Sequence, residues 1–190
     1  MTQHNQTVYQ ARTFSLVREP VRMPDGAETV WSVVRHPGAA CVLPLDGDDV
    51  IVCRNYRPHL GVWMLELPGG TVEAGETPLE AARRELREEA GFAAGAIAPL
   101  GAFRSLQGFS DFVLHYHLAT DLTPVAQRLD EFERVEVTRV PFGALVAMLE
   151  RGALEDSQIP VCLFMAMLRG ALPPRHQAAL RACFGGDGSA

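Results

Sequence analysis

Three glutamates, Glu85, Glu88 and Glu89, lie within five residues in the stretch GGTVEAGETPLEAARRELREEAGF, which runs from Gly69 to Phe92. On a helix with about 100° per residue, their side chains lie within one arc of about 100°. Clustered carboxylates bind hard divalent cations such as Mg²⁺ or Mn²⁺, which in turn bind phosphates. The alternative is a surface helix laced with Glu–Arg pairs, but this does not explain Glu85 and Glu89, which repel each other one turn apart.

The residues around these glutamates predict a helix over 78–90. Thr77 suits the N-cap, Pro78 suits the first helical position, and Glu80 stands three residues after the cap, which is the spacing of a capping box. Gly91 suits the left-handed conformation that ends many helices. We therefore expect the three carboxylates to project from one face of a short helix.

Two glycines favour binding of a metal ion or a phosphate beside this helix, and the overall charge disfavours a nucleic-acid partner. Gly69 and Gly70 lack side chains, so their backbone can approach an ion or a phosphate closely, which favours the metal-binding interpretation. The formal net charge is −6, so we expect no nucleic-acid partner, because such binding needs a basic face. An anionic substrate would need a metal ion or well-placed arginines beside it.

Strands outnumber helices along the rest of the chain, which predicts an α+β fold with an α/β/α arrangement. Residues 13–36 predict a hairpin that turns at Asp25-Gly26, after a polar segment 1–12 that we expect to be frayed. The other predicted strands are ACVLPL, VIVCRNY, VWMLELP, 97–104, 111–119 and RVEVTRVP, with a loop over 121–131. Helices are predicted over 142–151 and 158–169, followed by a disordered tail, GGDGSA.

The sequence also predicts a cytoplasmic protein. No run of 18 apolar residues is present, and the N-terminus lacks the basic and apolar regions of a secretion signal, so neither a membrane nor an export pathway is expected. The cysteines lack the CxxC spacing of zinc sites, and we expect them to be reduced thiols packed in the interior. They are Cys41, Cys53, Cys162 and Cys183.

The glutamate-rich stretch resembles the Nudix box of the Nudix hydrolases. The matching residues are Gly70, Glu76, Arg84, Glu85, Leu86, Glu88, Glu89, Gly91 and Phe92. The order of WSVVRHPGAACVLPL, VIVCRNYRP, WMLELPGGT, the box and a C-terminal helix pair is similar to the ADP-ribose pyrophosphatase branch. The resemblance implies a mixed sheet between helices, with a Nudix domain at 39–170 and a C-terminal tail at 171–190. It also implies a homodimer formed through an N-terminal strand region at 1–38.

The resemblance further implies roles for the residues of the box. Glu85 and Glu89 match the principal metal ligands, Glu88 matches an additional ligand, and the Gly69-Gly70 turn supplies a carbonyl to the metal, with Gly70 also beside the substrate. Arg84 matches the arginine that orients the box glutamates. The implied cofactor is Mg²⁺ or Mn²⁺.

Outside the box, Glu133 matches the glutamate that activates water, with Glu85 as the alternative base. Arg57 matches a substrate-binding arginine, and we expect it to hold a phosphate through two parallel hydrogen bonds. Arg35 and Trp31 lie near the positions that bind pyrophosphate and adenine.

The implied reaction is metal-dependent hydrolysis of the pyrophosphate bond of a small nucleotide, with ADP-ribose giving AMP and ribose 5-phosphate. One segment departs from the pattern: Gln107 and Phe112 stand where the branch commonly has Pro and Glu, although Asp111 is adjacent. Nucleotide sugars and dinucleotides are therefore alternative substrates. A domain that senses nucleotides without cleaving them and an RNA-decapping enzyme are the other functions that the sequence leaves open.

Overall fold

The computed structural model describes residues 5–184, so the GGDGSA tail lies outside the described residues. Within this range the strands are β1 (Gln6–Gln10), β2 (Ser15–Arg22), β3 (Glu28–Arg35), β4 (Ala39–Asp46), β5 (Asp49–Arg57), β6 (Val62–Glu66), β7 (Gly69–Thr71), β8 (Phe92–Phe103), β9 (Leu114–Pro124) and β10 (Val135–Pro141). The helices are α1 (Pro78–Glu88), α2 (Phe142–Glu150), α3 (Gln158–Leu168) and α4 (Pro174–Phe184). None of these helices is long and apolar enough to cross a membrane.

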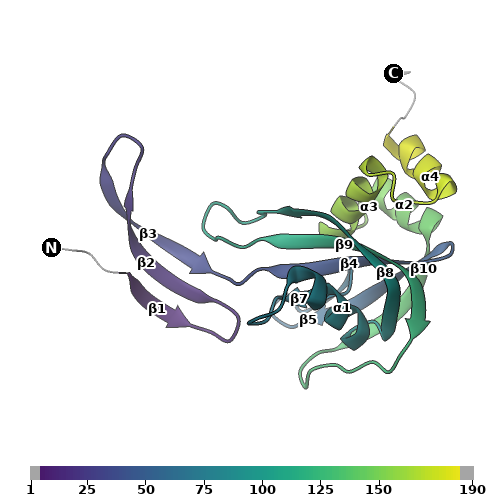
Figure 1. Ribbon diagram of the computed structural model, residues 1–190, viewed down its shortest axis with the longest axis horizontal. Coiled ribbons are helices and arrows are strands. Elements are labelled where there is room, and N and C mark those ends of the chain that lie inside the picture. The colour runs from purple at the N-terminus through teal and green to yellow at the C-terminus, as the bar shows by residue number, and fades with distance from the viewer. Residues whose placement is uncertain (1–4, 185–190) are drawn as a thin grey trace.

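A mixed sheet of seven strands forms the centre of the molecule (Figure 1). Its strand order is β10-β5-β4-β9-β8, with β6 paired to β5 and β7 paired to β4. Strands β4 and β9 run parallel, whereas their neighbours pair antiparallel. Helix α1 covers one face, and α2, α3 and α4 lie against the other. The predicted α+β class and its α/β/α sandwich are confirmed.

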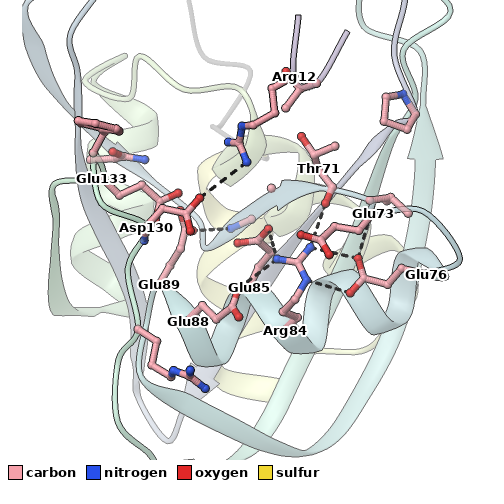
Figure 2. A pocket seen from close by; sticks show the side chains of 18 of the residues that line it. Arg12, Thr71, Glu73, Glu76, Arg84, Glu85, Glu88, Glu89, Asp130 and Glu133 are labelled. Carbon is pink, nitrogen blue, oxygen red and sulfur yellow. Dashed lines mark hydrogen bonds and ion pairs between the residues drawn. The ribbon is translucent and has the colours of Figure 1, made fainter.

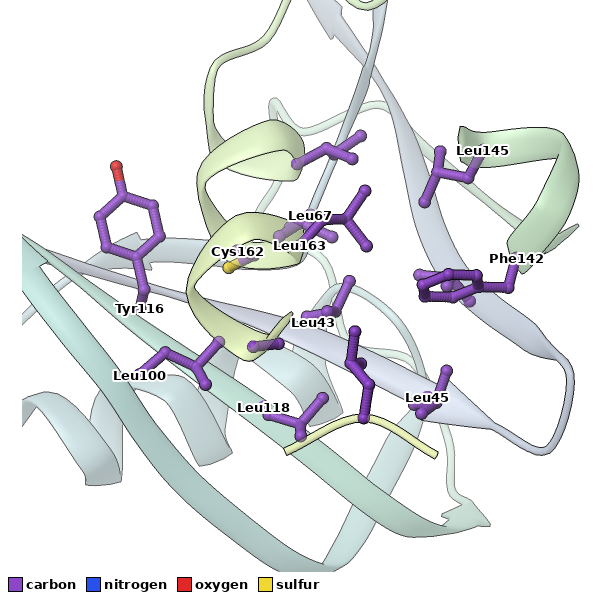
Figure 3. Close-up of a cluster of buried hydrophobic side chains, with 14 of the residues drawn as sticks. Leu43, Leu45, Leu67, Leu100, Tyr116, Leu118, Phe142, Leu145, Cys162 and Leu163 are labelled. Carbon is purple, nitrogen blue, oxygen red and sulfur yellow. The ribbon is translucent and has the colours of Figure 1, made fainter. Parts of the chain in front are cut away.

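Strands β4 and β5 divide their side chains between two cores. Leu43 and Val52 belong to the core beneath α2, α3 and α4, part of which is shown in Figure 3, whereas Val42 and Ile51 belong to the core beneath α1. Because both faces of these strands are covered, their sequences are continuous apolar runs rather than alternating patterns. Because β4 and β5 are fixed between the two cores, β7, which pairs with β4, and the end of β5 lie beside α1.

Strands β1, β2 and β3 form a separate antiparallel sheet that extends away from the main sheet (Figure 1). The predicted hairpin at Asp25-Gly26 is confirmed, with Gly26 in the left-handed region at φ 87°. The expectation that residues 1–12 are frayed is wrong for Gln6–Gln10, which pair with β2. This segment of five residues is too short to show a clear periodicity, and its strand conformation is stabilised by pairing with β2.

Two other local predictions are wrong. Strand β9 continues to Pro124, so the loop predicted over 121–131 begins later than expected. Helix α4 occupies much of the stretch that we expected to be a tail, and its Leu180 is fully buried. The ring of His176 on α4 stacks on Phe142, with 4.2 Å between ring centroids. The domain boundaries at 38/39 and 170/171 stay predictions.

Candidate active site

Helix α1 begins as its sequence predicts. The Thr77 hydroxyl accepts a hydrogen bond from the Glu80 backbone N–H at 3.3 Å, and the Glu80 carboxylate accepts one from the Thr77 backbone N–H at 2.7 Å. This reciprocal capping box satisfies two backbone donors that a helix start leaves unpaired. After the helix, Gly91 has φ 70°, which suits glycine.

A cavity of about 990 Å³ opens beside this helix. It receives side chains from α1, β7, the end of β5 and the loop between β9 and β10, and Arg12 enters it from the loop between β1 and β2 (Figure 2). The predicted site residues that it brings together are Arg57, Gly69, Gly70, Arg84, Glu85, Glu88, Glu89 and Glu133. Residues far apart in the sequence therefore meet at one end of the sheet.

The three glutamates occupy different depths of the cavity wall. Glu85 and Glu89 are buried, and Glu88 is half-buried. Glu89 Oε2 accepts a hydrogen bond from the Gly69 backbone N–H at 2.8 Å. Burial raises the pKa of Glu89 to about 8, reinforced by the nearby carboxylates of Glu85 and Glu133, and burial also raises the pKa of Glu85. The protein itself therefore compensates the negative charge of Glu89 poorly.

Arg84 is surrounded by acceptors. Its guanidinium donates to Glu76 Oε1 at 2.9 Å, to Glu85 Oε1 at 2.8 Å, to Glu88 Oε2 at 3.1 Å and to the Thr71 carbonyl at 3.0 Å (Figure 2). These bonds fix the rotamers of two of the clustered glutamates. They are the contacts that an orienting role for Arg84 requires.

The donor set fits a hard divalent cation. Glu89 is 6% exposed and forms no ion pair with any residue of the described chain, so its charge lacks a cationic partner at hydrogen-bonding distance. A Cβ atom on Gly70 would lie 2.2 Å from Glu85 Oε1, so the close approach of backbone to carboxylate requires glycine there. Over residues 5–184 no three acidic, histidine or cysteine side chains already converge on one point. Glu85 and Glu88 instead turn to Arg84.

Arg57 has a partner that we did not predict. Its Nε donates to Glu66 Oε1 at 2.8 Å and its Nη2 donates to the other oxygen of the same carboxylate. Glu66 is buried, and the sequence signal for it was a lone acidic residue in the apolar strand VWMLELP. Because this pairing uses one edge of the guanidinium, the two-bond contact with phosphate that we predicted for Arg57 is not available through that edge.

The structure does not bring Arg35 or Trp31 to this cavity. Arg35 pairs with Glu19 and, at 3.0 Å, with Asp111, and it lines a second cavity of about 370 Å³. Trp31 lies on β3 opposite Glu19 of β2, and its side chain is 46% exposed. From the N-terminal sheet, the main cavity is lined only by Arg12 and Thr13 of the β1–β2 loop, among the residues that the structure describes.

The segment that departs from the resemblance lies near Arg35. Gln107 is exposed, whereas the ring of Phe112 packs edge-on against His36 with 5.0 Å between centroids. Asp111 accepts hydrogen bonds from Arg35 and from the His36 backbone N–H, each at 3.0 Å. The acid of this segment therefore has a structural role beside the second cavity.

The loop that carries Glu133 is tied to the end of α1. Gln127 Nε2 donates to the Glu89 carbonyl at 2.6 Å, and the Arg128 backbone N–H donates to the Glu88 carbonyl at 2.9 Å. Glu133 is half-buried, and its Oε2 accepts the Asp130 backbone N–H at 2.9 Å. The sequence offered no signal for Arg12, Gln127 or Asp130, because each acts from a loop whose path only the fold determines.

Comparison with known proteins points to one family. The NUDIX domain family model matches residues 34–160. The chain is 32% identical over 168 residues to an ADP-ribose pyrophosphatase of Bacillus subtilis, covering 87% of this chain and 91% of that protein. It is 32% identical over 157 residues to an ADP-ribose pyrophosphatase of Mycobacterium tuberculosis, covering 80% and 76%. A crystal structure of an ADP compounds hydrolase has the same fold, with a TM-score of 0.75, 24% identity, and coverage of 92% and 94%.

Proposed function

The chain belongs to the Nudix family and is a Nudix hydrolase, and from this premise we propose that it cleaves the pyrophosphate bond of ADP-ribose, giving AMP and ribose 5-phosphate. The observation that carries the proposal is the cavity beside α1, where Glu85, Glu88 and Glu89 meet Glu133. The names of the two pyrophosphatase relatives support ADP-ribose as the substrate.

We propose Mg²⁺ or Mn²⁺ as the cofactor, held by Glu85, Glu89 and Glu88, with a backbone carbonyl from the Gly69-Gly70 turn. Carboxylate and carbonyl oxygens are the ligands that these cations prefer. When bound, the cation neutralises charge on the diphosphate and lowers the pKa of a coordinated water. A positive ion at this position would also compensate the buried charge of Glu89.

The protein's own groups would then orient the reactants and move the proton. Arg84 holds Glu85 and Glu88 in place through its hydrogen bonds to both carboxylates. Glu133 is the proposed general base, because it shares the cavity with the clustered glutamates and keeps Oε1 outside its bond to Asp130. General-base catalysis typically contributes about 10²–10⁴-fold to the rate. Glu85 remains the alternative base.

A second candidate exists for the group that is linked to the nucleoside diphosphate. Gln107 and Phe112 depart from the ADP-ribose pattern, which favours a nucleotide sugar or a dinucleotide as the second candidate substrate. A sensor that binds nucleotides without cleaving them is the alternative of a different class. The complete set of clustered acids supports the enzyme, because binding alone does not require a proton acceptor beside the diphosphate.

A substrate panel tests this proposal. ADP-ribose, NADH, a nucleotide sugar, a diadenosine polyphosphate and a nucleoside triphosphate are each incubated with the protein and Mg²⁺ or Mn²⁺, and the products are identified by chromatography. AMP and ribose 5-phosphate from ADP-ribose, formed faster than products from the other compounds, are the expected result. Binding of these nucleotides without any cleavage would establish the sensor instead.

We also propose a cytoplasmic homodimer. The N-terminal sheet exposes the large apolar side chains of Val8, Tyr9 and Trp31, with exposed fractions of 51%, 58% and 46%. A second copy that covers these side chains would remove them from water. Gel filtration with light scattering should give twice the mass of 20.7 kDa.

A further inference from the structure

The arginines of the main cavity differ in how many donors remain free. Four arginines line it, namely Arg12, Arg57, Arg84 and Arg128, together with seven acidic residues. Arg84 donates to three carboxylates and a carbonyl, and Arg57 turns one edge to Glu66. Arg35, which we expected to bind the pyrophosphate, is paired outside this cavity. An arginine that binds an anionic substrate must therefore be one whose donors are not engaged by these protein acceptors.

Arg12 is an arginine with donors available for that purpose. It lies between β1 and β2 and reaches over the clustered glutamates toward Asp130 (Figure 2). Its Nη1 is 3.8 Å from Asp130 Oδ2, which is too long for a hydrogen bond. The two side chains are 85% and 70% exposed, so this ion pair is weak and easily exchanged.

The position of Arg12 matches the path of a two-part ligand. Arg12, Thr13 and Pro37 line both the main cavity and the second cavity of about 370 Å³. A nucleoside diphosphate linked to another group extends beyond its two phosphates, so a ligand anchored at the glutamates that continues into the second cavity passes Arg12. Arg128 sits differently, because it also lines a small pocket of about 220 Å³ formed with Arg84 and Arg87.

We propose that Arg12 is a substrate-binding residue: it exchanges Asp130 for a phosphate oxygen of the nucleoside diphosphate. The planar guanidinium suits phosphate because it offers two parallel N–H donors. Asp130 holds the unliganded arginine near its target and competes with the substrate for it. The inference rests on the proposed hydrolysis, since it concerns the same diphosphate.

Binding and kinetics of Arg12 variants test this inference. Calorimetric titration of the metal-free protein with α,β-methylene ADP-ribose, which cannot be hydrolysed, measures affinity, and turnover of ADP-ribose with Mg²⁺ measures KM and kcat. Arg12→Ala should weaken binding and raise KM by about tenfold or more, because a charge-assisted hydrogen bond is lost. Arg12→Lys should recover part of the loss, and Asp130→Asn should lower KM.

Arg22→Ala is the matched control, because Arg22 is an exposed arginine of the same sheet that lines none of the three cavities. The thermal midpoint of Arg12→Ala should equal that of the wild type, since an exposed ion pair contributes little. Wild-type affinity and KM in Arg12→Ala, or an equal loss in Arg22→Ala, would overturn the role of Arg12. A wild-type protein that cleaves no nucleotide would instead overturn the proposed function.

Discussion

Replacing Glu89 by Gln should make the metal-free protein more stable and the enzyme inactive. The pKa of Glu89 is about 8 in the folded protein, against an ordinary value of 4.5. Because the folded state binds this proton more tightly than the unfolded state, the contribution of Glu89 to stability is most favourable below pH 4.5 and is lost as the pH rises toward 8. At about 1.36 kcal/mol for each pH unit, the full penalty above pH 8 reaches about 5 kcal/mol.

Glutamine removes this penalty because it does not ionise, and its amide oxygen can still accept the Gly69 N–H. Urea unfolding in EDTA should therefore show equal stability of the wild type and Glu89→Gln near pH 4.5. The difference should grow to about 3 kcal/mol at pH 7, which is 2.5 pH units above the ordinary pKa. Glu155→Gln, at an exposed position outside the cavity, is the control and should show no such growth.

Addition of Mg²⁺ at pH 8 should reverse the order if the proposed site is correct, because a cation that binds the folded wild type would compensate the buried carboxylate. Turnover of ADP-ribose should fall by orders of magnitude in Glu89→Gln. If the two proteins keep the same stability at pH 5 and pH 8 in EDTA, the charge of Glu89 is already compensated and the reasoning about the cluster is wrong.

Three further substitutions test other parts of the structure. Gly70→Ala should lower kcat more than tenfold without unfolding the protein, because the added Cβ would lie 2.2 Å from Glu85 Oε1 and would push that carboxylate out of place; circular dichroism checks the fold. Glu133→Gln should reduce kcat by about 10²–10⁴-fold with little change in stability, and a smaller loss would favour Glu85 as the base. Leu180→Ala should cost about 2–5 kcal/mol in urea unfolding, because the side chain is fully buried; no loss would mean that α4 does not pack on the core in solution.

Sequence reasoning succeeded where neighbouring residues decide the structure. The capping box at Thr77, the end of α1 at Gly91 and the hairpin at Gly26 depend on contacts within a few residues, so spacing alone predicts them. It failed for β1 and α4, whose short segments carry weak periodicity. These elements are stabilised by a neighbouring strand and by burial of Leu180, which no local pattern reveals.

The sequence by itself determined that three glutamates share one face of α1, since helix geometry fixes their directions. The packing of β7 beside α1 decided that Gly70 stands against the Glu85 carboxylate. Only the tertiary structure decided which charges remain available. Arg57 meets Glu66 because β5 pairs with β6, and Arg35 meets Asp111 because the loop before β9 lies against β3 at Val34 and Ser110. Arg12 is brought to the cavity by the loop between β1 and β2. The partners of a charge depend on distance in space, and that distance is set by packing rather than by separation along the chain.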